Sequence, residues 1–331
     1  MFKDLMCLKA GAAVLAIGTA LLTSSAAEAA KVRVVYGDIA SVESLHLLAA
    51  FERAKEQGVD IEMTYLKSED IAAQAVVGGQ ADIGVGGPYA LVQKVKAPIR
   101  MFMQLSTLRF YPAVNGEFYK TWKDLNGQEV AVHSRGSGTE AIMKLMEQRQ
   151  GIKFSKISYI PGAEVRTGAL LQGNVKASIV DSSGRRLLET QAPGKFVILP
   201  LEGVNATDEA LFANTNFLEK NAADVDKIVE AILTTWREVM ANPAVVSEWR
   251  AKYKLLPDLP AAQASDIGPY FDELAKGKAF PLNGGGAAAA KDDFAFYTLS
   301  GQLTGEAASL KVEDFWDTRP LDRVLAKVGS K

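Results

Sequence analysis

Residues 75–85, AVVGGQADIGV, decide the fold, and residues 169–180, ALLQGNVKASIV, repeat their pattern. In both segments an apolar helix end is followed by a glycine, a few small or polar residues and a short apolar strand. Glycine ends helices readily because it adopts the left-handed conformation without a steric penalty. Any helix-to-strand turn shares some of this pattern. Two such closely matched units nevertheless favour two similar α/β lobes over one long sheet.

The segments around both units alternate between strand and helix. Strands are expected at 32–36, 59–66, 81–85, 99–105, 129–133, 157–160, 175–180 and 196–199. After residue 213 this alternation gives way to helical patterns, such as the amphipathic stretch 225–240. Alternating strands and helices predict an α/β fold with mostly parallel sheets, and the helical tail is expected to pack on the lobes.

The N-terminus is organised like a secretory signal peptide. Lys3 and Lys9 flank the start of an apolar run from Ala10 to Leu22, and Ala27-Glu28-Ala29 matches an Ala-x-Ala cleavage site. A membrane-spanning helix needs about 20 apolar residues, so a cleaved signal is favoured over a membrane anchor. We expect residues 1–29 to be removed, and the mature chain to begin near Ala30 and to reside in the periplasm.

Composition excludes several classes of function. Cleavage of the signal removes Cys7, the only cysteine, so the mature chain has no disulfide, cysteine nucleophile or thiolate metal site. The net charge of −2 argues against a nucleic-acid partner, which normally requires a basic face. His46 and His133 are the only histidines and belong to different expected elements, so neither a metal nor a cofactor is predicted.

Four segments carry a family resemblance through their order and spacing. They are residues 75–88, WKDLNGQEVAV at 122–132, GSGTE at 136–140 and VEDFWD at 312–317. Together they resemble periplasmic substrate-binding proteins of ABC importers, in the branch of aliphatic-sulfonate and thiamine-precursor binding proteins. The resemblance extends over most of the mature chain.

This resemblance implies a two-lobe periplasmic binding protein fold of type II, with two crossover strands and a ligand held between the lobes. Lobe 1 is expected to comprise residues 30–113 and 212–331, including the C-terminal helices, and lobe 2 residues 114–211. The implied partners are a small-molecule ligand and an ABC importer permease, with the receptor itself a monomer. Closure is expected to hinge near 108–113 and 211–215.

The candidate ligand-binding residues lie in loops after strands, because open α/β sheets bind ligands at the carboxyl ends of their strands. The strongest candidate is the turn Ser137-Gly138-Thr139, where unpaired N–H groups, two hydroxyls and the helix dipole predict an anion site. Ordinary capping by Ser137 is the alternative. The other candidates are Ser41, Gly86, Gly87, Arg109 and Asp181, with Arg135 as a second arginine able to pair with an anion.

These features favour an extracytoplasmic receptor that captures a small organic solute and delivers it to an ABC importer. Three expected helix N-termini favour an anion such as a sulfonate or carboxylate, and a neutral pyrimidine or amide stays open. An enzyme on the same fold is the alternative, although the mature chain lacks the cysteines of the enzymatic relatives and the G-x-S-x-G of serine hydrolases. A receptor of a tripartite carrier is a third hypothesis.

Overall fold

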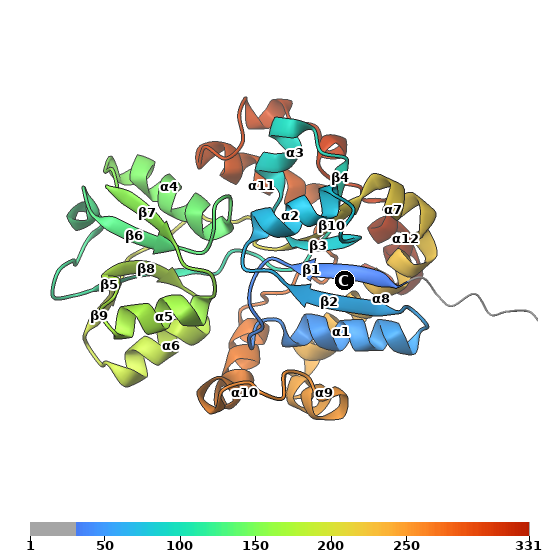
Figure 1. Ribbon diagram of the computed structural model, residues 1–331, viewed down its shortest axis with the longest axis horizontal. Helices are drawn as coiled ribbons and strands as arrows, with labels where there is room; N and C mark the ends of the chain where they lie inside the picture. Colours follow the sequence, from blue (N-terminus) through green and yellow to red (C-terminus); the bar gives the residue numbers. More distant parts are fainter. Residues whose placement is uncertain (1–30, 331) are drawn as a thin grey trace, which may run out of the picture.

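The computed structural model describes residues 31–330, so the expected signal peptide and its cleavage site lie outside the described residues. Two mixed five-stranded sheets form the centres of two lobes, and helices flank each sheet (Figure 1). The two-lobe α/β architecture expected from the sequence is therefore confirmed. Within residues 31–330, none of the helices has both the length and the apolarity that a bilayer-spanning segment requires.

The two sheets have the same topology. Lobe 1 has the strand order β2-β1-β3-β10-β4, and lobe 2 has the order β7-β6-β8-β5-β9. In each sheet the first three strands are parallel, and the fourth runs antiparallel to the strand on either side of it. The lobe 1 strands are β1 (Val32–Tyr36), β2 (Ile61–Tyr65), β3 (Ile83–Gly86), β4 (Ile99–Gln104) and β10 (Ala210–Asn214). The lobe 2 strands are β5 (Tyr111–Asn115), β6 (Glu129–Val132), β7 (Lys156–Tyr159), β8 (Ala177–Val180) and β9 (Phe196–Ile198).

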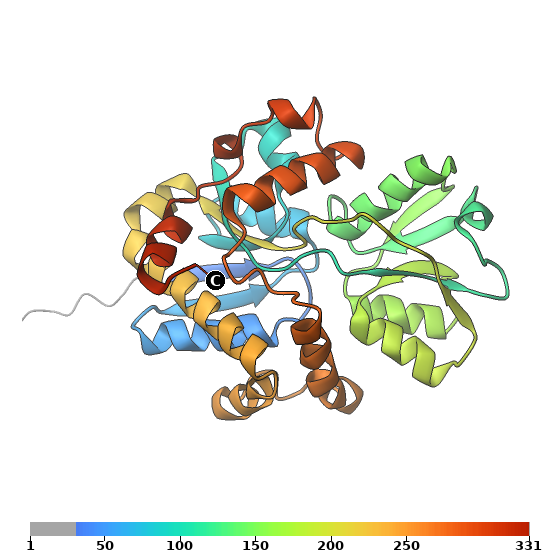
Figure 2. The same cartoon turned by 180° about the vertical axis from the view of Figure 1, so that it is seen from behind.

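The chain passes from lobe 1 to lobe 2 just before β5 and returns to lobe 1 just before β10. Seen from behind, two chain segments run between the lobes, one leading from β4 to β5 and the other from β9 to β10 (Figure 2). The domain boundaries expected at residues 113 and 211 fall inside β5 and β10, because the chain crosses before each of these strands begins. Neither strand was recognised from the sequence pattern.

The repeated sequence unit folds in the same way in both lobes. Helix α2 (Glu69–Val77) ends at a turn in which Gly79 has a φ of 71°, and helix α5 (Ala163–Leu171) ends at a turn in which Gly173 has a φ of 77°. The backbone hydrogen bonds match one for one: the amides of residues 78–81 bond to the carbonyls of residues 74–76, and those of 172–175 bond to 168–170. Gly84 of β3 has a further reason to be glycine, since a Cβ there would lie 2.1 Å from the Phe212 ring of β10.

The remaining helices complete the lobes. Lobe 1 carries α1 (Leu45–Glu56), α3 (Tyr89–Val95) and the C-terminal helices α7 (Thr215–Lys220), α8 (Ala222–Ala241), α9 (Val245–Tyr253), α10 (Ala261–Lys276), α11 (Gly286–Leu299) and α12 (Arg319–Val328). Lobe 2 carries α4 (Gly138–Gln150), α5 and α6 (Ser182–Gln191). The tail packs on lobe 1 as expected, and its Trp236 is fully buried, donating a 2.9 Å hydrogen bond to His46 Nδ1. Burial lowers the pKa of His46 to about 3, so this histidine is a neutral part of the core.

Candidate ligand site between the lobes

A cavity lies between the lobes, at the edge where the carboxyl ends of the parallel strands meet. Its inner section is lined by Gly37, Asp38, Glu43, Glu69, Asp208 and Glu209 from the lobe 1 side, by Phe110, and by His133, Ser137, Gly138, Thr139, Ala163 and Arg166 from lobe 2. A middle section includes Glu43, Arg109, Asp181 and Glu209. The outer section, about 300 Å³ in volume, includes Ser41, Glu43, Glu164, Asp181, Gln263 and Asp266. Glu43 lines all three sections.

The structure brings most of the predicted residues to this cavity. Ser137, Gly138 and Thr139 line the inner section, while Ser41 and Asp181 line the outer one. Arg109 reaches the middle section, but its Nη2 donates a 2.6 Å hydrogen bond to the carbonyl of Gly277. Gly87 and Arg135 line a separate crevice of about 350 Å³ beside α2, α3 and α4. Gly86 is not among the residues that line these cavities, and a Cβ on it would lie 3.0 Å from the Glu69 side chain. Ligand contact by any of these residues stays a prediction.

The hydroxyls of the predicted anion site already have protein partners. Ser137 Oγ accepts a 3.3 Å hydrogen bond from the amide of Glu140 and lies 2.9 Å from Thr139 Oγ1. Thr139 Oγ1 in turn accepts a 3.0 Å hydrogen bond from the amide of His133. Ser137 therefore caps α4 locally, and Thr139 ties the helix start to the end of β6.

Two helix starts that the sequence suggested for an anion each face a carboxylate of lobe 1. A Cβ on Gly138 would lie 3.2 Å from Asp208 Oδ1, so this carboxylate sits at the N-terminus of α4. The amide of Gly87, just before α3, donates a 2.8 Å hydrogen bond to Glu69 Oε2. A negative charge is favourable at these positions, and the protein supplies it itself.

Five carboxyl groups from the lobe 1 side crowd the inner section, namely Asp38, Glu43, Glu69, Asp208 and Glu209. Burial and the neighbouring negative charges raise the pKa of Glu69 to about 8 and that of Asp208 to about 7. The same causes raise the pKa of Glu43 and Glu209 well above the usual carboxyl range. These groups resist ionisation because they are buried and lie near other carboxyl groups.

The lobe 2 wall holds the inner section's single arginine. Arg166 of α5 is only 2 % exposed, and it donates 2.9 Å and 3.0 Å hydrogen bonds to the carbonyls of Ile179 and Ile160. His133 lies nearby and joins the two lobes. Its Nδ1 accepts a 3.3 Å hydrogen bond from the amide of Gly162, so Nε2 carries the proton and donates to the Gly37 carbonyl at 2.9 Å. Burial also lowers the pKa of His133, so the ring is neutral.

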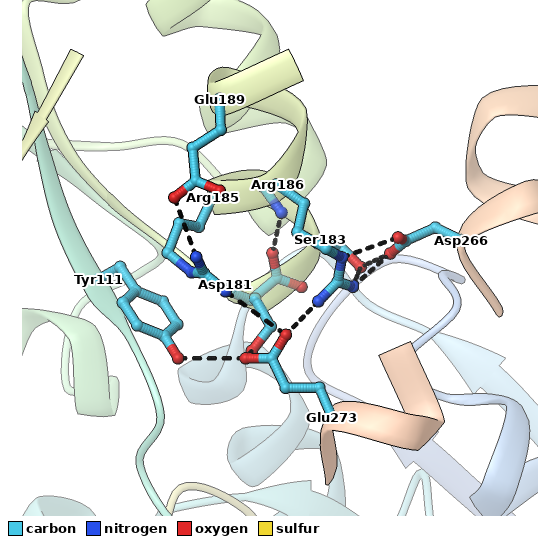
Figure 3. Close-up of polar contacts among 10 residues, drawn as sticks. Tyr111, Asp181, Ser183, Arg185, Arg186, Glu189, Asp266 and Glu273 are labelled. Atoms are coloured by element: carbon cyan, nitrogen blue, oxygen red, sulfur yellow. Dashed lines mark hydrogen bonds and ion pairs between the residues drawn. The ribbon is translucent and has the colours of Figure 1, made fainter. Parts of the chain in front are cut away.

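A second set of contacts joins the lobes beside the outer section. Arg186 of α6 binds Asp266 of α10 with two hydrogen bonds of 3.0 Å and 2.8 Å, and it also contacts Glu273 (Figure 3). Ser182 and Tyr111 donate to Glu273 as well, at 2.9 Å and 3.3 Å. Together with the His133–Gly37 bond, these contacts hold the lobes together over the cavity.

None of the acidic clusters in the described part of the chain forms a metal site. Among residues 31–330, no three Asp, Glu, His or Cys side chains converge closely enough to hold a metal ion. The carboxylates are spread over a wall instead of being gathered at a point, which suits a ligand with several contacts.

The chain matches the family model described as "NMT1/THI5 like" over residues 54–245. It belongs to this family. No curated protein gives a significant sequence match. Among solved structures, a protein of Bordetella bronchiseptica RB50 is 22% identical with a TM-score of 0.74, and the match covers 92% of this chain and 99% of that one.

Two other solved structures share the fold of this NMT1/THI5-like protein. The alkanesulfonate-binding protein SsuA from Xanthomonas axonopodis pv. citri, bound to MOPS, is 17% identical with a TM-score of 0.65, over 88% of this chain and 99% of that one. The periplasmic nitrate-binding protein NrtA from Synechocystis PCC 6803 is 12% identical with a TM-score of 0.68, over 91% of this chain and 90% of that one. At these identities the likeness establishes the two-lobe periplasmic binding protein fold.

Sequence reasoning missed most of the charged residues of the cavity. Glu43 and Glu69 occupy the predicted kind of position, because each lies in or next to the start of a helix that follows a strand. The pair Asp208-Glu209 precedes β10, which was not recognised as a strand, so no signal placed it at the cleft. Arg166 lies inside an expected helix, where an arginine is usually a surface residue.

Proposed function

We propose that this protein is an extracytoplasmic receptor that captures a small organic solute between its lobes and delivers it to an ABC-type importer. The proposal places the mature protein in the periplasm, with the importer's membrane permease as its partner. Family membership and the fold shared with named binding proteins support the receptor role. The organisation of residues 1–29 supports export.

The observation that carries the proposal is the cavity between the lobes. Both lobes contribute its lining, the chain crosses twice between them, and hydrogen bonds such as His133 to Gly37 span the gap. The inner and middle sections have volumes of only about 20 and 30 Å³, so a solute larger than water enters only when the lobes separate. Hinge closure around a solute is a common motion of such proteins.

Five of the residues that the sequence suggested as ligand contacts line the cavity. Ser41, Ser137, Gly138, Thr139 and Asp181 line the cavity and are proposed to contact or approach the ligand. At Gly138 and Gly87, two of the helix starts from which the sequence favoured a sulfonate or carboxylate ligand, the protein places carboxylates of its own.

The cavity's chemistry favours a receptor over a hydrolase. Both ring nitrogens of His133, which lines the inner section, are engaged by backbone groups. His46 lines the middle section, and burial lowers its pKa to about 3, so it is a poor base. A general base needs a free nitrogen within reach of the proton that it removes. Thr139 and Ser137 likewise bond to each other and to the local backbone, so neither is activated as a nucleophile.

Native mass spectrometry of the mature protein, isolated from the periplasm under gentle conditions, tests the proposal. We expect a small-molecule adduct that is lost on denaturation, and a smaller radius of gyration by small-angle scattering when that molecule is returned to the stripped protein. A protein that carries no adduct, and whose scattering is unchanged by every solute tried, would contradict the receptor role.

A further inference from the structure

We infer that the ligand carries a positively charged nitrogen, an ammonium or amidinium group, which the carboxylate of Glu43 binds where the three sections of the cavity meet. This inference rests on the proposed receptor function and names the chemical class of its ligand. It departs from the anion that the sequence suggested.

The first support is the imbalance of charge around the inner section. Five carboxyl groups line it against one guanidinium, that of Arg166, while His133 is neutral. Arg166 is itself committed to the carbonyls of Ile160 and Ile179. Crowded carboxyl groups in an enclosed space repel one another, and a cation placed among them removes that repulsion.

Glu43 and Asp208 are the two carboxylates of the inner section to which no donor is bonded among residues 31–330, and of the two only Glu43 also lines the outer section. It lines the inner, middle and outer sections, and among residues 31–330 no side chain or amide donates a hydrogen bond to it. The charged groups that act on it most strongly are the carboxylates of Glu209, Asp208 and Asp181. A buried or half-buried carboxylate is normally paired or hydrogen-bonded, so Glu43 is poised for a donor from outside the protein.

Independent support comes from buried oxygen atoms that accept no hydrogen bond in the described part of the chain. Glu164 Oε1 and Gln263 Oε1 both belong to residues lining the outer section. These atoms can only accept, so a ligand that satisfies them must bring N–H or O–H groups.

The same geometry argues for an organic cation over a metal ion or an anion. No three potential metal ligands of residues 31–330 converge on a point, whereas the outer section has the 300 Å³ that a small organic molecule requires. An anion would add charge to a carboxylate wall, and the helix starts at Gly138 and Gly87 already face Asp208 and Glu69.

The test uses the mature protein stripped of bound solute and a panel of probes at constant ionic strength. The cation-bearing probes are putrescine, agmatine and the zwitterion γ-aminobutyrate, and the anions are ethanesulfonate, butyrate and nitrate. Each is measured by thermal shift and titration calorimetry. Native mass spectrometry identifies the solute that co-purifies.

Glu43→Gln is the test variant, and Glu52→Gln is its matched control. Glu52 is the next glutamate after Glu43 in the sequence. It lies on α1 and pairs with Lys55. We expect Glu43→Gln to weaken a cation-bearing ligand at least tenfold and to leave the melting temperature of the stripped protein unchanged or higher. A merely structural glutamate would lower it. Glu52→Gln should change both by little.

The outcomes separate the two proposals. A co-purified solute with a basic nitrogen, or stabilisation by a cation-bearing probe that Glu43→Gln abolishes, supports the inference. Binding of γ-aminobutyrate but not of putrescine or agmatine also supports it, and adds a contact for the carboxylate end. A bound solute without a basic nitrogen, or an anion whose binding Glu43→Gln leaves unchanged, overturns the cation inference and keeps the receptor. A protein that carries no solute and responds to no probe overturns both.

Discussion

The two walls of the cavity differ in how their charges are satisfied. On the lobe 2 wall, Arg166 is fixed by two backbone carbonyls, and Asp181 accepts a 2.7 Å hydrogen bond from the amide of Gly184. On the lobe 1 wall, Glu43 and Asp208 accept no hydrogen bond from residues 31–330. Lobe 2 thus pairs Arg166 and Asp181 with its own backbone and leaves only Glu164 Oε1 of this wall without a donor, whereas lobe 1 presents two whole carboxylates that suit a donor-bearing ligand.

Replacing Arg166, the buried arginine of the lobe 2 wall, should have the largest effect on stability. Arg166→Met leaves two carbonyls without donors and removes the positive charge nearest to the carboxylates, so we expect it to lower the free energy of unfolding by about 3 kcal/mol. Urea unfolding measures this. Arg185→Met, which changes a more exposed arginine of the same lobe, should cost about 1 kcal/mol or less. Equal losses in both variants would mean that the burial and backbone hydrogen bonds of Arg166 do not make it a special part of the lobe 2 wall.

A larger side chain at Gly138, between the two walls, should have the next largest effect, on ligand binding and on lobe closure. In Gly138→Val the new Cβ would lie 2.3 Å from Leu108 Cδ2 and would crowd Asp208, so we expect the lobes to be held apart and ligand binding to weaken about a hundredfold. The fold should persist because Ser137 still caps α4. Small-angle scattering should show a larger radius of gyration than for Gly168→Val, where a Cβ meets nothing within 4 Å. A variant as compact as the wild type would contradict this.

The buried carboxyl groups around the cavity should make the stripped protein less stable at high pH. Glu69, Asp208 and Glu164 have folded pKa values of about 8, 7 and 7, against ordinary values of 4.5, 3.8 and 4.5. Between these limits the folded state binds more protons than the unfolded state, so stability falls as the pH rises through about 7 to 8.

Thermal melts of the ligand-free protein measure this pH dependence. We expect the melting temperature to fall by roughly 10 °C or more between about pH 6 and pH 9, since the three groups together cost several kcal/mol over this range and about 1 kcal/mol corresponds to 2–4 °C in a protein of this size. Glu69→Gln should flatten the curve, while Glu52→Gln should not. A melting temperature that rises over this range would show that the wall is already balanced by positive charge.

The smallest effect on ligand binding and stability is expected from removing the hydroxyl of Thr139, which belongs to the strongest candidate site in the sequence. From the turn alone, Thr139→Ala is predicted to weaken ligand binding about tenfold. The structure adds an internal role, since Thr139 Oγ1 bonds to the His133 amide and to Ser137, and its loss should cost about 1 kcal/mol of stability. Calorimetry and urea unfolding on Thr139→Ala and on Thr139→Ser, which keeps the hydroxyl, separate the two roles. Weaker binding with unchanged stability would favour direct ligand contact.

Local signals in the sequence were sufficient to predict the two lobes but not to predict the strands β5 and β10. The helix-to-strand units at Gly79 and Gly173 were readable because hydrophobic period and glycine position depend on neighbours in the chain. The strands β5 and β10 are short, lie in the middle of the sheets and pair with distant strands. Their identity depends on the pairing itself, which no local pattern records.

The sequence by itself determined the α/β class, the repeated unit, the loops at the carboxyl ends of the strands and the cap at Ser137. Each follows from the backbone preferences of residues close together in the chain. Only the tertiary structure decided the charge of the cavity, because Asp208 reaches Gly138 and Glu43 meets Glu209 across long sequence separations. The net charge of −2 does not predict that five carboxyl groups gather on one wall. The electrostatic environment of a group depends on its distances to other charges, which only the folded structure sets.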